Sequence, residues 1–234
     1  MSNMSVVPPS PPSGWPVPPG RHAVLRSPVG LSKIVRGLLG LVIVADLFAL
    51  WLGNQSYVLI GRLLRNAGSV TAQEIDQTDS LYRVCGIVQV AATLATAVVF
   101  VVWFHRARVN AEVFAPEYHT KARGWAIWAW FVPVANLWFP RRIAIDIWNA
   151  SASANTRSAA LLHWWWALWI VNLVFGRLAS QRYANAGTPD EFEGAVAGLM
   201  ASDGLNVVAA VLAVLFVRRL TRMQHEKALR GPVF

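Results

Sequence analysis

The chain has 234 residues, of which 55% are hydrophobic and only 14% are charged, and its mean hydropathy is +0.41. Soluble domains carry about 25% charged residues, so this composition argues against any soluble fold. The net charge is +9, but the basic residues flank apolar blocks and form no continuous stripe, which favours anchoring at a lipid surface over nucleic-acid binding. We therefore expect an all-α, polytopic transmembrane helical bundle whose partner is the lipid bilayer and not a nucleic acid.

The first segment of the chain is rich in proline. Residues 1–30 hold eight of the 13 prolines and show little apolar periodicity. Such a segment favours extended conformations and lacks the apolar surface needed for a packed core. We expect a disordered cytoplasmic leader over residues 1–30, with a proline-rich ligand for an aromatic groove as the alternative. An integral membrane helical domain is expected over residues 31–225, followed by a short cytoplasmic tail over residues 226–234.

Four apolar blocks predict membrane-crossing helices, because a helix needs about 20 apolar residues to span the hydrocarbon core. The blocks are residues 37–61, 84–104, 159–176 and 204–217. The last block is short, but uncharged residues 194–201 precede it, and Asp203 and Arg218 are expected at its two interfaces. The sequence therefore predicts four spans.

A fifth apolar block, residues 125–139, is too short to cross. As a helix its 15 residues cover about 22 Å, whereas the hydrocarbon core is about 30 Å thick. Pro133 removes a helix hydrogen bond near the middle of the block, and Pro140 ends the block before two arginines. We expect a broken, Trp- and Pro-rich central segment that enters the membrane and leaves on the same side.

The distribution of basic residues separates four spans from five. With four spans and a cytoplasmic N-terminus, 16 of the 21 basic residues lie in the cytoplasm. With residues 125–139 as a fifth span, 10 lie inside and 11 outside. Only the first arrangement satisfies the positive-inside rule. We expect a multi-pass protein of the bacterial cytoplasmic (inner) membrane with both termini in the cytoplasm.

Two stretches share an order of features that suggests an internal repeat. The corresponding positions are Gly61 and Gly176, Asn66 and Asn185, Thr71 and Thr188, and Glu74 and Glu191. Both threonines have the spacing of a capping box, so each predicts a helix start. Each start leads to an amide residue, Gln89 or Asn206, followed by small residues. We hypothesise two hairpins of the same hand, related by an axis along the membrane normal.

Two motifs lie around the centre of the chain. Residues 103–110 read W-x-x-R-A-R-x-N, and residues 130–140 read W-F-x-P-x-x-N-L-W-x-P. Both resemble the domain of unknown function 4328 family of bacterial membrane proteins, and the resemblance covers roughly residues 35–225. It implies an integral membrane domain, often behind a disordered leader, with no established activity to transfer.

The residues of these motifs predict a structural contact. Pro133 and Asn136 break the helix where backbone groups need partners, and Arg106 and Asn110 share a helix face that could supply them. We favour such a bond over a ligand site. The residues assigned to this structural motif are Trp103, Arg106, Asn110, Trp125, Pro133, Asn136 and Pro140.

Several arginines are expected at the cytoplasmic interface. They are Arg106, Arg108, Arg141, Arg142, Arg218, Arg219 and Arg222. Ordinary interfacial anchoring explains them most simply, as an aromatic belt explains the tryptophans nearby. The alternative is a ring of guanidinium groups that contacts an anionic phospholipid headgroup or another phosphate.

Asp46 is the most informative single residue, because it lies about ten residues, or some 15 Å, from Arg36 and so near the middle of the first span. A charged carboxyl group is costly there and is by default a functional hypothesis. A protonated carboxyl group that bonds another helix is the alternative. The residues considered as intramembrane polar partners of Asp46 are Gln89, His163, Asn172 and Asn206.

The sequence contains no pattern typical of an enzyme. Metalloprotease, hydrolase, P-loop and dinucleotide-binding motifs are missing, and Cys85 has no second cysteine for a disulfide or zinc site. We expect no catalytic residues, cofactor or metal. The favoured function is a non-catalytic membrane component that recruits an unknown protein partner or anionic lipid through its cytoplasmic basic face. The alternative is a small-solute or proton-linked transporter that uses Asp46.

Overall fold

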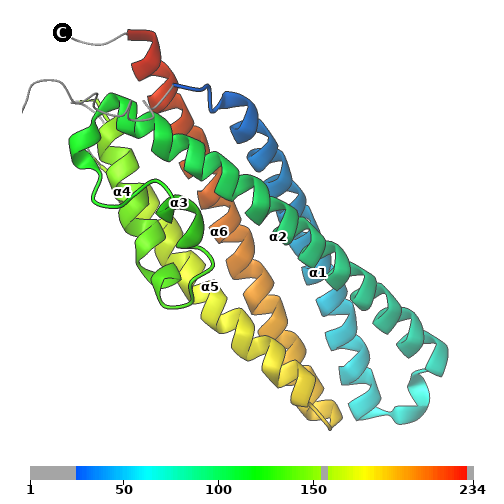
Figure 1. The fold of residues 1–234 in the computed structure, drawn as a ribbon. Coiled ribbons are helices and arrows are strands. Elements are labelled where there is room, and N and C mark those ends of the chain that lie inside the picture. Colours follow the sequence, from blue (N-terminus) through cyan, green and yellow to red (C-terminus); the bar gives the residue numbers. More distant parts are fainter. Residues whose placement is uncertain (1–24, 154–157, 231–234) are drawn as a thin grey trace, which may run out of the picture.

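The computed structural model describes residues 25–153 and 158–230, and these residues form helices and turns without strands. Four long helices, drawn in Figure 1, dominate: α1 (Val29–Arg65), α2 (Ala72–Phe114), α5 (Ala160–Asn185) and α6 (Pro189–Arg230). Between α2 and α5 lie two short helices, α3 (Trp125–Trp128) and α4 (Phe139–Ser151). Single 3₁₀ turns are found at Ala67–Ser69, Pro116–Tyr118 and Ala135–Leu137. The all-α class is therefore confirmed.

The long helices form two hairpins whose connections lie at the same end of the molecule. α1 and α2 are joined by residues 66–71, and α5 and α6 by residues 186–188. α1 packs along both α2 and α6, and α5 packs along α6. The start of α1 and the end of α6 lie at the opposite end, beside α4 (Figure 1). The predicted leader lies outside the described residues up to position 24, and α6 continues through position 230.

Both predicted capping boxes are present. Glu74 N–H donates to Thr71 Oγ1 (3.2 Å) and Thr71 N–H donates to Glu74 Oε2 (3.0 Å). At the start of α6, Glu191 N–H donates to Thr188 Oγ1 (3.4 Å) and Thr188 N–H donates to Glu191 Oε2 (3.2 Å). These bonds satisfy backbone donors at the start of each helix, so each hairpin connection is short and well defined.

In the described residues, three helices are long and apolar enough to cross a membrane: α1, α2 and α6. α5 falls below this criterion although it has 26 residues, because its first half carries histidine, asparagine and several tryptophans. α5 is therefore mixed in composition rather than purely aliphatic.

The block at residues 125–139 does not form one continuous helix. α3 has four residues, a turn follows, and the 3₁₀ turn Ala135–Leu137 precedes α4, which begins at Phe139. Pro140 lies in the first turn of α4, where its missing N–H costs no helix hydrogen bond. α3 and α4 both pack on α2, and α4 also contacts α5 and α6. The chain thus fills the space beside α2 with a folded, broken segment.

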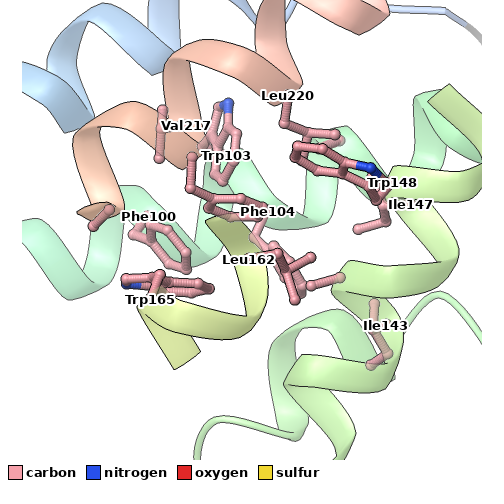
Figure 2. Close-up of a cluster of buried hydrophobic side chains, with 14 of the residues drawn as sticks. Phe100, Trp103, Phe104, Ile143, Ile147, Trp148, Leu162, Trp165, Val217 and Leu220 are labelled. Carbon is pink, nitrogen blue, oxygen red and sulfur yellow. The ribbon is translucent and has the colours of Figure 1, made fainter. Parts of the chain in front are cut away.

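The main core lies at the end of the bundle that contains α3 and α4. Figure 2 shows part of it, with rings of α2 and α5 close to one another and aliphatic side chains of α6 beside them. Trp165 stacks on Phe216 with ring centroids 4.8 Å apart, and Phe100 lies 5.7 Å from Trp165. We call Phe100, Trp103, Phe104, Trp165 and Phe216 the aromatic cluster; each is at most 8% exposed. Trp103, Trp165 and Trp166 are buried core residues and so form no part of an exposed aromatic belt.

The two hairpins resemble each other in which positions are buried, but not in how their helices pack together. Ala92, Thr96 and Phe100 on α2 and Ala209, Ala213 and Val217 on α6 are buried at the same distance from their capping threonines. However, α1 packs along α6, whereas α2 and α5 share no comparable interface in the described residues. The α3–α4 segment lies between the two hairpins and packs on α2. The hairpins are therefore not related by the two-fold axis that we hypothesised.

Candidate functional site

A carboxyl group lies at the centre of the bundle. Asp46, in the middle of α1, is only 2% exposed. Its Oδ1 accepts a hydrogen bond from Gln89 Nε2 on α2 (2.9 Å), and its Oδ2 accepts one from Asn206 Nδ2 on α6 (2.7 Å). Because a buried polar group is costly without partners, these two bonds fix the level at which α2 and α6 meet α1.

A second carboxyl group shares one of these donors. Gln89 Nε2 also donates to Asp203 Oδ1 on α6 (3.2 Å). A side-chain amide nitrogen carries two hydrogens, so it can donate one to each carboxyl group. In the described part of the chain, neither Asp46 nor Asp203 forms a hydrogen bond or ion pair with lysine, arginine or histidine. The two acids are thus bridged by an amide and not neutralised by a cation.

The hydrogen bonds continue to the fourth long helix. Asn172 Nδ2 on α5 donates to Asn206 Oδ1 (3.0 Å), and Ser202 Oγ on α6 donates to Asn172 Oδ1 (3.4 Å). Every long helix therefore contributes at least one side chain. We call this set the central polar cluster; its members are Asp46, Gln89, Asn172, Ser202, Asp203 and Asn206.

The structure brings together four of the five residues considered as intramembrane polar groups. The fifth, His163, is exposed on α5 and lies with its Nδ1 3.4 Å from Arg141 Nη2. Sequence reasoning missed Ser202 and placed Asp203 at an interface. Asp203 and Asn206 are three residues apart and so share a face of α6, but this spacing does not say which helix that face meets.

Most residues of the central polar cluster lie in a region that matches a protein family. Residues 66–222, more than half of the chain, match the family described as Domain of unknown function (DUF4328). The chain belongs to this family. No curated protein and no solved structure matches it. The DUF4328 match begins after α1, so it includes Gln89, Asn172 and Asn206 but not Asp46.

The first motif in the DUF4328 region docks the elements at the α4 end of the bundle onto one another. Trp103 Nε1 donates to Thr221 Oγ1 on α6 (3.2 Å). Asn110, 1% exposed, binds the backbone of Arg26 twice: Oδ1 accepts from Arg26 N–H (3.0 Å) and Nδ2 donates to Arg26 C=O (2.8 Å). Arg106 Nη1 donates to Ser27 C=O (3.4 Å). This motif therefore holds residues 25–28 against α2 and α6.

This arrangement differs from the predicted contact between the two motifs. Arg106 and Asn110 bond to the segment before α1 and not to the region around Pro133, because backbone N–H and C=O groups of that segment lie outside any helix and beside α2. Asn136 Oδ1 is buried without a hydrogen-bond partner. Trp125 packs edge-on against Phe139 at 5.0 Å, and Pro140 is buried at the start of α4.

The seven arginines expected at an interface in the DUF4328 region have different environments. Arg108 is 3% exposed and donates to Glu112 Oε2 (2.7 Å) and Lys121 C=O (2.8 Å). Arg219 lies over the Trp148 ring at 5.3 Å, and Arg222 pairs with Glu226 at 3.4 Å. Arg106 and Arg141 also have partners within the protein, so five of the seven are engaged. The other two, Arg142 and Arg218, are exposed. The structure does not gather these side chains into one ring.

Proposed function

We propose that all four long helices cross a bilayer and that both termini lie in the cytoplasm. α5 has 26 residues, about 39 Å as a helix, and runs along α6, which supports its crossing together with α6. The end of the bundle with the hairpin connections is acidic, whereas the end with α4 carries most of the basic residues. The acidic residues near the connections are Glu74, Asp76, Asp79, Asp190, Glu191 and Glu193. This asymmetry supports a cytoplasmic location for the α4 end.

We further infer a proton-linked, non-catalytic function. Asp46 and Asp203 hold a proton between them, and its uptake and release are linked to movement of a small solute or of protons across the membrane. The observation that carries this proposal is the single Gln89 amide nitrogen that bonds both carboxyl groups inside the bundle. No cofactor is required.

The physical reason is the cost of charge in a nonpolar interior. Desolvation of one carboxylate costs several kcal/mol, and two carboxylates that share a donor also repel each other. Amide donors from Gln89 and Asn206 stabilise one negative charge but supply no positive charge. The pair is therefore stable with one proton, and a change in proton number changes the bonds that join α1, α2 and α6.

Infrared spectroscopy of the full-length protein in lipid vesicles tests this proposal. At neutral pH we expect a carbonyl band from a protonated carboxyl group, which the Asp46→Asn/Asp203→Asn double variant loses. Asp76→Asn, at an exposed position of α2, should keep the band. Identical spectra of the double variant and the unmodified protein would show that the acids hold no proton.

A second candidate function rests on the exposed arginines. We propose that Arg142, with Arg141 beside it on α4, binds anionic phospholipid at the cytoplasmic interface. Native mass spectrometry should show loss of retained anionic lipid in Arg141→Ala/Arg142→Ala, and no loss in Arg65→Ala at the opposite end. Equal lipid retention in all three proteins would contradict this role.

A further inference from the structure

A row of polar side chains leads from the central polar cluster to the end with the hairpin connections. On α2, Asp79, Tyr82, Cys85 and Gln89 follow one another at intervals of three or four residues, so they lie on one face of the helix. Tyr82 is about 10 Å along the helix axis from Gln89, and Asp79 is about 15 Å from it. Cys85 donates to Ala45 C=O on α1 (3.8 Å), which shows that this face is turned toward α1.

Tyr82 links this row to the other hairpin. Its hydroxyl oxygen lies beside Gly53 of α1, where Met200 of α6, three residues before Asp203, also makes contact. Its ring stacks on Tyr183 of α5, with centroids 6.2 Å apart and planes 17° apart. Asp79, one turn before Tyr82 on α2, is exposed, and Tyr183 lies two residues before the end of α5. The two stacked rings thus lie between the level of Asp203 and the end with the hairpin connections.

In the opposite direction, rings separate the buried polar side chains. Thr96, about 10 Å beyond Gln89 on α2, donates to Ala92 C=O of its own helix, and the buried Thr221 and Gln224 on α6 lie at or beyond the aromatic cluster. Phe100 lies about 16 Å beyond Gln89 on α2, and Phe216 lies about 15 Å beyond Asn206 on α6. These rings belong to the aromatic cluster, whose members pack at centroid distances of 4.8–6.5 Å (Figure 2). Close-packed rings leave little space for water. The bonded indole N–H among them, Trp103 Nε1, donates to Thr221 Oγ1, on the side away from the central polar cluster.

We propose that the central polar cluster exchanges its proton with one side of the membrane, the side of the hairpin connections, through Tyr82 and Tyr183. The aromatic cluster closes the route to the other side. This inference rests on the proposed proton-linked function and adds its direction and its path.

The transfer requires no other reactant than water. A proton from water near Asp79 passes to a tyrosine oxygen as that hydroxyl group gives its own proton onward, and the last hydroxyl group, Tyr82, delivers a proton to the Asp203 carboxylate. Each tyrosine ends with the proton count with which it began. Release follows the same steps in reverse.

Proton exchange of the cluster after a one-sided pH step, followed by infrared spectroscopy, tests the path. The full-length protein is inserted in one orientation into vesicles, and the pH is changed on one side only. We expect the carboxyl band to respond rapidly when the pH is changed on the side of the hairpin connections, and at least tenfold more slowly from the other side. Tyr82→Phe, which keeps the ring but removes the hydroxyl group, should slow the fast exchange at least tenfold.

The control is Tyr57→Phe, which removes a hydroxyl group from an exposed position on α1 and should leave the rate unchanged. Equal exchange rates from the two sides, or an unchanged rate in Tyr82→Phe, would overturn the inference while the carboxyl band itself persists. Absence of the band in the unmodified protein would instead reject the proposed function, so the two failures are distinct.

Discussion

Glu112 shows how single residues stabilise the α4 end of the molecule. Arg123 Nε donates to its Oε2 (2.9 Å), and Arg108 Nη1 donates to the same oxygen (2.7 Å). The two guanidinium groups, Arg123 foremost, lower the pKa of Glu112 to about 2. Glu112 therefore stays ionised at neutral pH and joins α2 to the segment that follows it.

This lowered pKa predicts a pH-dependent stability. The pKa in the folded state is below the unfolded value of about 4.3, so the stabilisation is complete above that value and is lost as the pH falls toward 2. Glu112→Gln should destabilise the protein by about 2 kcal/mol at pH 7, because Arg108 keeps a buried charge without its partner. Thermal unfolding in detergent should show this difference shrinking between pH 5 and pH 3.

The matched control is Glu226→Gln, because the Arg222–Glu226 pair is also spaced i to i+4 but is largely exposed. Exposed pairs contribute about 0–1 kcal/mol, so this variant should unfold nearly as the unmodified protein does at every pH. A Glu112→Gln variant with the same pH profile as the unmodified protein would show that the ion pair does not stabilise the fold.

The sequence predicted the buried position of Asp46, which stands alone in its apolar block. It did not predict the position of Asp203, which depends on a contact between two helices. Asp46 is the one charge in a long apolar block, so its burial and its need for amide partners could be inferred. Asp203 stands at the edge of a shorter block, where hydropathy alone favours an interface. Its position inside the bundle is seen only from the hydrogen bond that Gln89 on α2 donates to Asp203 on α6. That contact is a long-range packing relation, which composition and spacing do not contain.

At the scale of elements, local rules gave the helix starts and tertiary contacts gave the rest. The capping boxes at Thr71 and Thr188 depend on residues three apart, so the sequence determines them directly. The break at residues 125–139 follows from Pro133 in the same way. In contrast, the bond between Asn110 and Arg26 joins residues 84 positions apart, and no local pattern predicts which extended backbone an amide side chain will bind.

The lengths of the helices were also predicted only in part from the sequence. The apolar blocks predicted helices of about 14 to 25 residues, whereas α2 has 43 residues and α6 has 42. Hydropathy marks only the part of a helix that suits a bilayer. The flanking polar turns continue because capping, ion pairs and packing on neighbouring helices stabilise them beyond the apolar part.

At the scale of the whole molecule, the proposed arrangement depends on whether α5 crosses the membrane. Crossing by α5 places its connection to α6, at residues 186–188, on the same side as the loop between α1 and α2. It also places α4 on the opposite side, because α4 precedes α5 in the chain. The path proposed through Tyr82 and Tyr183 then has an aqueous end on one defined side.

Labelling of single cysteines by a membrane-impermeant maleimide tests this arrangement. In a Cys85→Ser background, Ser69→Cys and Gly187→Cys should react in intact bacterial cells, because the proposed arrangement places both connections outside. Asn149→Cys, exposed on α4, should react only after the cells are made permeable. Cys85 is the one cysteine of the sequence, so its replacement by serine removes any background labelling. Serine has nearly the size of cysteine, so the replacement is a small change at this buried position. If Gly187→Cys and Asn149→Cys react under the same conditions, α5 does not cross, and the bundle has an odd number of spans with its termini on opposite sides.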